Sequence, residues 1–424
     1  MLAETLEQVQ SLPSKRAMYV RIILVALAAI TVFKAYWFFR WGSWGSDFAG
    51  FHVVAQRVWL GDLDLTYQFQ AFMKMQAEVS GRAATFMSWT YPPQFDLLLA
   101  PFALLPVWAS YLLFTATTLA IYLVTLRAMA GNNFAQVLVI LFPAMALTIA
   151  SGQNGFLTGT LIGLVCINLQ KRQPRSELIA GLALGAMVIK PHLAIAVGVY
   201  LLATRRWMAI VSAAVLVLVS SLLCTLIFGP QVWTAWLGAI KESASFLERG
   251  LYPLFRMISG YAVLYTFGVP ASAAFWGQTV VAVLALFAVV LAIVRGMSPP
   301  FALGISAMVS VMISPYAYDY DLPIVGVGLA LLLPDLVRLA SARERSFIYG
   351  LVLLAGAYGL LQSTRLAAQS GQNVGQHFAP AIAGFAMMAL LALLLRILLR
   401  KAEPALASRP ERAQILPHPA GVLE

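Results

Sequence analysis

The feature that most constrains this chain is a series of apolar runs, many about as long as a membrane-spanning helix. A helix needs roughly 20 apolar residues to cross the hydrocarbon of a bilayer. The runs that we interpret as spans cover residues 18–39, 107–128, 134–150, 153–170, 208–228, 274–294, 301–314, 322–337, 346–362 and 379–396. With two irregular stretches, they predict an all-α, polytopic membrane helix bundle of about 12 membrane segments, some short or broken.

The charge content agrees with this interpretation. Hydrophobic residues make up 61% of the chain and charged residues 11%, against about 45–50% and about 25% in soluble domains. A soluble globule with so few charges could not cover its own surface. The composition therefore excludes a soluble enzyme, a disordered chain and a nucleic-acid-binding domain, and no nucleic-acid partner is expected.

The basic residues predict the orientation. The net charge of +11 comes from Lys and Arg that cluster between apolar runs, at Lys171–Arg175, Arg205–Arg206, Arg338–Arg345 and Arg396–Lys401. By the positive-inside rule these clusters are cytoplasmic. Both termini are then expected in the cytoplasm, and residues 40–92 and 229–273 form long outer loops. We expect one transmembrane domain over residues 1–400 and a disordered cytoplasmic tail over 401–424.

Two stretches do not fit a simple crossing. Residues 177–204 lie between basic segments that are both expected inside, and Lys190-Pro191 stands in the middle. Because proline blocks a helical turn and disfavours helix at the preceding residue, we expect two half-length helices with Lys190 at their apex. Residues 93–105 could be a half-helix or a thin crossing. The outer loops are expected to carry helices near 47–60, 69–79 and 232–247, the last one amphipathic.

Polar side chains within or beside a membrane bundle are costly, so each is a candidate site residue. The predicted topology brings a set of them to the outer side from segments far apart in the chain: Asp47, Gln153, Asn154, Lys190, His192, Arg256, Asp319 and Asp321. The sequence contains no phosphate loop, no Ser/His/Asp triad and no Cys/His metal cluster. We therefore expect no cofactor and no metal.

Each candidate also has a structural explanation. Asp47 could cap the helix that follows, and Lys190 could extend to a lipid headgroup. Gln153-Asn154 could be a helix start, His192 a packing residue and Arg256 a solvated loop charge. Asp319-Tyr320-Asp321 could be a cap with interfacial tyrosines, or an Asp-x-Asp metal motif.

Several segments, in this order, carry a resemblance to a known family. They are Ser46-Asp47-Phe48 with Phe51-His52, Ala55, Gly61-Asp62 and Tyr67; Tyr91-Pro92-Pro93 with Pro101 and Leu105-Pro106; Gly152 to Leu157; Gly181, Gly185 and Lys190-Pro191 with Arg205-Arg206-Trp207; and Ser314-Pro315-Tyr316 with Tyr318 to Asp321. Over roughly residues 40–330 the chain resembles glycosyltransferase family 87, bacterial mannosyltransferase-like enzymes of the type C glycosyltransferase fold.

The resemblance implies a function and its residues. Such an enzyme takes a sugar from a polyprenyl-phosphate donor and places it on a lipid or glycan acceptor, at the outer face of the bacterial inner membrane. The acid of the first outer loop, Asp47, would be the base, and Lys190 would lie near the donor phosphate. Substrate contacts are expected from Tyr91, Gln153, Asn154, His192, Arg256 and Tyr318 to Asp321. The family's mannosyltransferases carry a His-containing segment where this chain has Tyr318 to Asp321.

The chemistry of these residue types fits that function. Transfer from a sugar phosphate needs a base for the acceptor hydroxyl and positive charge for the departing phosphate. One carboxylate base acting in a direct displacement implies inversion at the anomeric carbon. The alternative is a secondary transporter or lipid flippase, because transport sites also use broken helices with a polar apex. A non-catalytic scaffold would not require these charges to converge.

Overall fold

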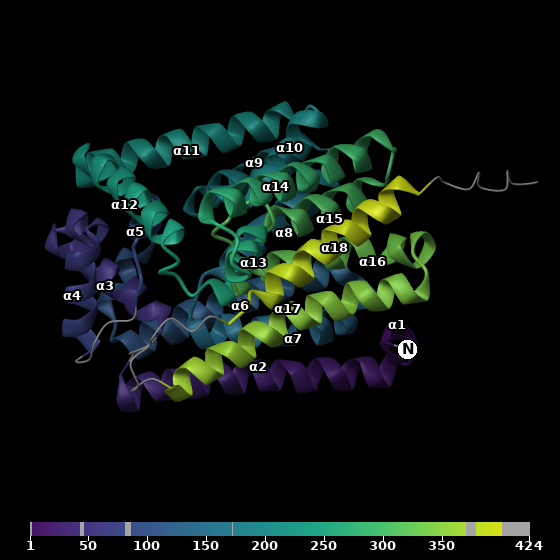
Figure 1. Cartoon of the computed structure of the whole chain (residues 1–424), viewed down its shortest axis with the longest axis horizontal. Helices are drawn as coiled ribbons and strands as arrows, with labels where there is room; N and C mark the ends of the chain where they lie inside the picture. The colour runs from purple at the N-terminus through teal and green to yellow at the C-terminus, as the bar shows by residue number, and fades with distance from the viewer. Residues whose placement is uncertain (1, 43–45, 81–85, 172, 370–378, 401–424) are drawn as a thin grey trace, which may run out of the picture.

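The computed structural model describes residues 2–42, 46–80, 86–171, 173–369 and 379–400, and within these ranges the chain is helical without strands. Figure 1 shows long helices running side by side. In chain order the α-helices are α1 (Leu2–Ser11), α2 (Pro13–Trp41), α3 (Asp47–Leu60), α4 (Phe69–Ser80), α5 (Pro93–Leu99), α6 (Val107–Ala130), α7 (Phe134–Ser151), α8 (Gly155–Leu169), α9 (Pro174–Ala186), α10 (Ile195–Ala203), α11 (Trp207–Phe228), α12 (Gln231–Glu248), α13 (Gly260–Thr266), α14 (Ala271–Val294), α15 (Pro299–Ser310), α16 (Pro323–Leu339), α17 (Ala342–Gln369) and α18 (Ile382–Leu399).

Several of these helices have the length and composition of membrane spans. Six stretches qualify among the described residues, namely Pro13–Trp41, Val107–Ser151, Trp207–Phe228, Ala271–Val294, Ala342–Arg365 and Ile382–Leu399. The stretch Val107–Ser151 contains both α6 and α7, and the apolar helices α8 and α15 are shorter. The all-helical fold is thus confirmed, whereas the count of about 12 membrane segments remains a prediction.

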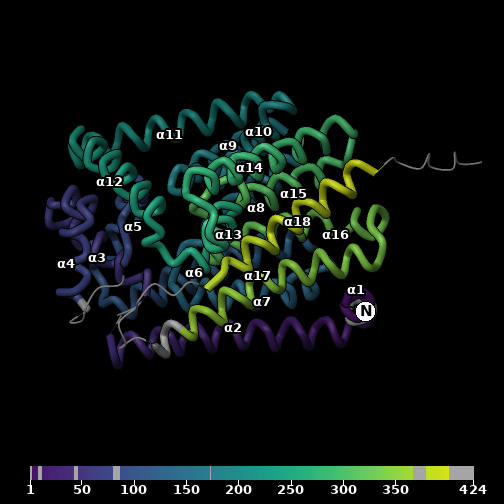
Figure 2. Tube along the Cα trace, viewed as in Figure 1, coloured from purple at the N-terminus to yellow at the C-terminus, as the bar shows by residue number. Residues whose placement is uncertain are grey.

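The two ends of the bundle differ. Figure 1 and the tube in Figure 2 show α1 and the end of α18 at one end, and α3, α4 and α12 at the other. The helix α1, which precedes the first predicted span, lies against α17, where Arg345 Nε donates to Glu7 Oε1 at 2.9 Å. The predicted tail, 401–424, lies outside the described residues.

The break at Lys190 appears as the proline predicts. Helix α9 ends at Ala186, two short 3₁₀ turns cover Met187–Ile189 and Pro191–Leu193, and α10 begins at Ile195. Lys190 between the turns has φ −146° and ψ 69°, outside the helical region. This agrees with the bias that a following proline imposes. Two half-length helices therefore present Lys190 at their junction.

The segment from α3 to α6 has an aromatic core of its own. Buried rings from α3, the 3₁₀ turn η1 (Leu63–Tyr67), α4, α5 and α6 pack together. Phe51 is central, with edge-to-face contacts to Trp89, Tyr91, Phe95 and Phe114. Residues 93–105 form α5 followed by the 3₁₀ turn η2 (Ala100–Leu104), too short to cross a bilayer. This core fixes the start of α3 against the bundle.

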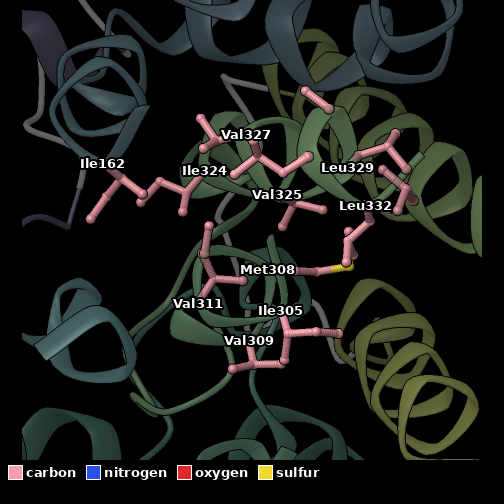
Figure 3. Packing of buried hydrophobic residues seen from close by; sticks show 14 of the residues in the cluster. Ile162, Ile305, Met308, Val309, Val311, Ile324, Val325, Val327, Leu329 and Leu332 are labelled. Atoms are coloured by element: carbon pink, nitrogen blue, oxygen red, sulfur yellow. The ribbon is translucent and has the colours of Figure 1, made fainter. Parts of the chain in front are cut away.

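The main apolar core lies inside the bundle. Helices α15 and α16 pack along their length, and Figure 3 shows side chains of both, with Ile162 of α8, filling the space between them. Met308 and Val325 are fully buried there. Between membrane helices such side chains stabilise the contact by close van der Waals packing. The core therefore holds the segment between α15 and α16 in place.

A buried acid in α5 gives a testable stability prediction. Asp96 of α5 is fully buried and accepts hydrogen bonds from Tyr67 Oη at 2.5 Å and Trp89 Nε1 at 2.9 Å. Burial raises the pKa of Asp96 to about 8, although both hydrogen bonds oppose the rise. Between its ordinary pKa and about 8 the folded chain then holds a proton that the unfolded chain releases. Stability should fall as pH rises through this window.

Asp96→Asn removes that titration while keeping the size of the side chain. We expect its Tm in detergent to stay nearly level from about pH 5 to 9, whereas the Tm of the unsubstituted protein declines. The Tm values of the variant and the unsubstituted protein should be similar at pH 5, and the Tm of the variant should be the higher one at pH 9. Parallel Tm curves for the two proteins would contradict the prediction.

Candidate functional site

Asp47 is the first residue of α3, and it does not cap the helix. The cap is Ser46, whose hydroxyl accepts from Phe48 N at 3.4 Å and donates to the Ser151 carbonyl at 3.1 Å. The cap explanation for Asp47 is therefore wrong. In the first turn the carboxylate is favoured by the helix dipole, and its oxygens are available for other contacts.

A hydrogen-bonded chain connects Asp47 to the start of α8. Gln153 Nε2 donates to Asp47 Oδ2 at 2.9 Å, and Tyr91 Oη donates to Gln153 Oε1 at 3.1 Å. Asn154 next to Gln153 is fully buried near the Tyr91 ring, and neither its amide nitrogen nor its amide oxygen meets a partner with good hydrogen-bond geometry. Gln153 thus contacts both the acid and the tyrosine directly, whereas Asn154 makes no hydrogen bond to either of them.

Lys190 forms a buried ion pair with the segment before α16. Its Nζ lies 2.7 Å from Asp321 Oδ1, and the two side chains are 8% and 1% exposed. The ammonium also lies over the rings of Tyr320, at 4.7 Å from the centroid, and Tyr91, at 5.8 Å. His192, half-buried, lies within electrostatic range of Lys190 and Asp321. Lys190 points into the protein and not toward a headgroup.

Arg256 forms the second buried pair. It lies in the 3₁₀ turn η6 (Leu254–Arg256) and donates through Nε and Nη2 to the two oxygens of Asp319, at 3.1 and 3.0 Å. Burial opposes its charge, but Asp319 and then Asp47 outweigh this effect and raise the pKa of Arg256. Arg256 is therefore a fixed cation and not a solvated loop charge.

The segment from Tyr318 to Asp321 holds both cations. Asp319–Asp321 forms the 3₁₀ turn η7, and Asp321 Oδ2 accepts from Tyr318 N at 3.1 Å. The rings of Tyr318 and Tyr320 stack at 5.1 Å, and Arg256 lies 5.6 Å from the Tyr320 centroid. Since both carboxylates are engaged by cations, the Asp-Tyr-Asp segment positions Lys190 and Arg256.

Two glycines allow this segment to approach its neighbours. A Cβ on Gly155 would lie 1.9 Å from the Tyr320 carbonyl oxygen, and one on Gly359 of α17 would lie 2.6 Å from Asp319 Oδ2. Real Cβ atoms do not make such contacts, so any side chain would displace the turn. Glycine at these positions is needed for the acids to reach their cations.

The structure brings the sequence-predicted residues into one cluster. Asp47 lies within electrostatic range of Arg256, Tyr91 and Tyr320. Hydrogen bonds and ion pairs connect Gln153 to Asp47, Lys190 to Asp321 and Arg256 to Asp319. Among the described residues, the Asp47 carboxylate accepts a hydrogen bond only from the Gln153 amide, and it lies beside two cations that are each paired with an acid. Such an arrangement can accept a proton at Asp47 and stabilise negative charge at Lys190 and Arg256.

Sequence reasoning missed Lys34, in α2. Its Nζ lies 5.1 Å from the Phe38 ring centroid and within electrostatic range of Asp47. The available signal was a lysine inside the apolar run Val32-Phe33-Lys34-Ala35-Tyr36, a position where charge is rare without a function.

The comparisons with known proteins bear on this cluster. No curated protein and no solved structure matched the chain. The family model described as Glycosyltransferase family 87 matches residues 89–315, more than half of the chain. That range contains Tyr91, Gln153, Lys190 and Arg256, and the structure adds Asp47 from before it and Asp321 from after it. A match of this extent, over the segments that build the buried polar cluster, shows that the chain belongs to glycosyltransferase family 87.

Proposed function

We propose that this membrane glycosyltransferase transfers a hexose or pentose, with mannose favoured, from a polyprenyl-phosphate donor. The acceptor is a lipid or glycan at the outer face of a bacterial inner membrane. Asp47 takes the proton of the acceptor hydroxyl, Lys190 binds the donor phosphate, and the sugar is transferred with inversion. Residues 1–400 act as a single transmembrane domain.

The observation that supports the proposal most strongly is the hydrogen bond between Gln153 Nε2 and Asp47 Oδ2. An amide N–H fixes the direction of the carboxylate without neutralising its charge. Asp47 therefore stays able to accept a proton, unlike Asp319 and Asp321, which are paired with cations. A positioned base is typically worth about 10²–10⁴-fold in rate.

The cations supply the other half of the chemistry. Lys190 and Arg256 both lie near the Tyr320 ring, so a phosphate beside that ring would meet two positive groups. As the bond to the sugar breaks, charge develops on the phosphate oxygen, and preorganised cations stabilise it. Tyr318, Tyr91 and Asn154 are the groups that we propose to contact the sugar, since aromatic faces and amides suit its hydroxyls. The acids of the Asp-Tyr-Asp segment act by holding the cations.

The direct test is sugar transfer by the purified protein. It would be incubated with a panel of radiolabelled polyprenyl-phosphate sugars and a membrane lipid extract, and labelled product would be separated from donor. We expect label to move from one of the donors, without added metal ion and with no change on adding EDTA. Transport of intact donor across vesicles without transfer would favour the flippase alternative.

The orientation is tested by cysteine labelling in intact cells. Glu78 of α4 is expected outside and Gln173 before α9 inside, and both are exposed. The native Cys166 and Cys224 are buried and give little background. We expect a membrane-impermeant maleimide to label Glu78→Cys in intact cells and Gln173→Cys only after permeabilisation. The opposite pattern would reverse the proposed topology.

A further inference from the structure

The turn that carries Arg256 is anchored through a tyrosine to which the proposed reaction gives no role. Tyr252 lies between α12 and η6, and its Oη lies 2.6 Å from Ser88 Oγ and 2.5 Å from Ser243 Oγ. Ser243 belongs to α12, whereas Ser88 belongs to the segment before α5, 164 residues from Tyr252 in the chain. The Tyr252 hydroxyl therefore joins two distant segments, and we call this bridge of three hydroxyl groups the Tyr252 clamp.

Two aromatic neighbours hold the ring of Tyr252. Its centroid lies 5.3 Å from that of Phe86 and 6.3 Å from that of Tyr316, both in the edge-to-face geometry that aromatic rings favour. Phe86 lies in the same segment as Ser88, and Tyr316 lies in the segment that leads to η7. Because these contacts come from different parts of the chain, the ring and the hydroxyl together fix the place of Tyr252.

The positions of Tyr252 and Arg256 are coupled through the backbone of η6. Leu254 N donates to the Tyr252 carbonyl oxygen at 2.8 Å, and Arg256 N donates to the Pro253 carbonyl oxygen at 2.9 Å. On the other side of the turn, an isolated β-bridge joins the chain to the segment before η7. The turn η6 is thus fixed at one end by the Tyr252 clamp and at the other end by the β-bridge.

The contact that Arg256 makes depends on its direction. Its Nε and Nη2 donate to the two oxygens of Asp319 at 3.1 and 3.0 Å, and its guanidinium lies 5.6 Å from the Tyr320 ring centroid. A two-point contact of this kind requires the guanidinium to keep one orientation. Since a misplacement of about 1 Å in an active site can cost about 10²-fold in rate, a shift of η6 would matter to the proposed reaction.

We propose that Tyr252 is a positioning residue, whose clamp fixes η6 and so directs the Arg256 guanidinium toward the departing phosphate. This inference rests on the proposed function, because it concerns a cation that would stabilise that phosphate. Among the described residues, the Tyr252 side chain forms no hydrogen bond to Arg256 or Asp319, so it acts through the backbone of the turn. The clamp thus holds one of the two cations in place before the donor binds.

The first test measures binding of undecaprenyl phosphate, which carries the phosphate monoester of the proposed leaving group. The purified full chain in detergent would be titrated with it, and binding followed by thermal shift. Tyr252→Phe removes the hydroxyl and keeps the ring, while Trp236 Nε1, which donates to the Thr90 carbonyl oxygen at 3.0 Å, still connects α12 to the segment before α5. We expect Tyr252→Phe to bind the probe about three- to tenfold more weakly, a part of what a charge-assisted contact provides.

A double-variant cycle shows whether this loss passes through Arg256. The reference background is Arg256→Met with Asp319→Asn, which removes both charges and leaves no buried carboxylate unpaired. It should bind the probe about tenfold or more weakly than the unsubstituted protein. Adding Tyr252→Phe to this background should change binding by less than about twofold, because no guanidinium remains to be positioned. An equal loss on adding Tyr252→Phe to either background would make Tyr252 independent of Arg256 and overturn the proposal.

Tyr265→Phe is the matched control. Tyr265 of α13 also bonds α12, since its Oη donates to the Glu248 carbonyl oxygen at 3.4 Å, but it is not part of the clamp. This variant should bind undecaprenyl phosphate as the unsubstituted protein does. Equal weakening in Tyr265→Phe and Tyr252→Phe would assign the effect to a general loosening between α12 and α13, and unchanged binding in Tyr252→Phe would leave the clamp without this role. Either result overturns the proposal.

The radiolabel assay gives the second readout. Tyr252→Phe should lower kcat by a similar factor while the KM for the donor stays nearly level, because the full charge on the phosphate develops only as the bond to the sugar breaks. A fall in Tm without this split would reduce Tyr252 to a structural residue and overturn the proposal. Failure of the proposed function would instead appear as no transfer from any donor by the unsubstituted protein, whatever the binding cycle shows.

Discussion

Asp47→Asn is expected to lower sugar transfer by at least about a hundredfold, the lower end of what a positioned base contributes. The amide keeps the size of the side chain but cannot accept the proton of the acceptor hydroxyl. Folding should be nearly unaffected, because Ser46 is the cap of α3 and Asp47 is not. Transfer rate and Tm, measured on the same preparation, check both parts of the expectation.

Two further variants sharpen the Asp47 test. Asp47→Glu should recover little of the transfer activity, because the added methylene displaces the carboxylate. In the unsubstituted protein Gln153 Nε2 lies 2.9 Å from Asp47 Oδ2, and this contact would be lost. Ser46→Ala is the matched control on the same turn, and loss of the cap should cost about 0.5–2 kcal/mol of stability while leaving most of the activity. Near-full transfer in Asp47→Asn would remove Asp47 from the role of base.

The sequence predicts which residues gather in the polar cluster because two physical rules apply to a chain of this composition. Charge is excluded from lipid unless it has a partner, so the few polar side chains of an apolar chain converge. The Lys190-Pro191 pair predicts a broken helix by local geometry alone, and the structure has that break between Ile189 and Pro191. Those parts of the site need no knowledge of the tertiary fold.

The pairing of the charges was beyond sequence reasoning. Lys190 and Asp321 are 131 residues apart, and Asp47 and Gln153 are 106 apart. Spacing on one helix or strand cannot indicate which acid meets which cation over such separations. The sequence therefore suggested sugar contacts for Asp319 and Asp321, whereas the structure shows them paired with Arg256 and Lys190. Lys34 was missed for a related reason, since no local pattern indicates that a lysine within the first span lies within electrostatic range of Asp47.

Lys190→Ala is expected to reduce transfer by about ten- to a few hundredfold. A charge-assisted contact to the donor phosphate is worth about 1.5–3 kcal/mol, and each decade of rate corresponds to about 1.4 kcal/mol. The same change leaves Asp321, 1% exposed, without its cation. Removing one partner of a buried pair typically costs about 3–5 kcal/mol of stability, so lost activity in this variant has two possible causes.

The double variant Lys190→Met with Asp321→Asn separates the two causes. It removes both charges, so no buried carboxylate is left unpaired, and its Tm should return most of the way to that of the unsubstituted protein. Its transfer rate should stay as low as that of Lys190→Ala, because the phosphate still lacks its cation. Lys190→Arg should keep part of the activity, since the charge remains but the Asp321 contact geometry changes. If the double variant regained both Tm and transfer, Lys190 would be a structural partner of Asp321 and the donor phosphate would have to be held by Arg256.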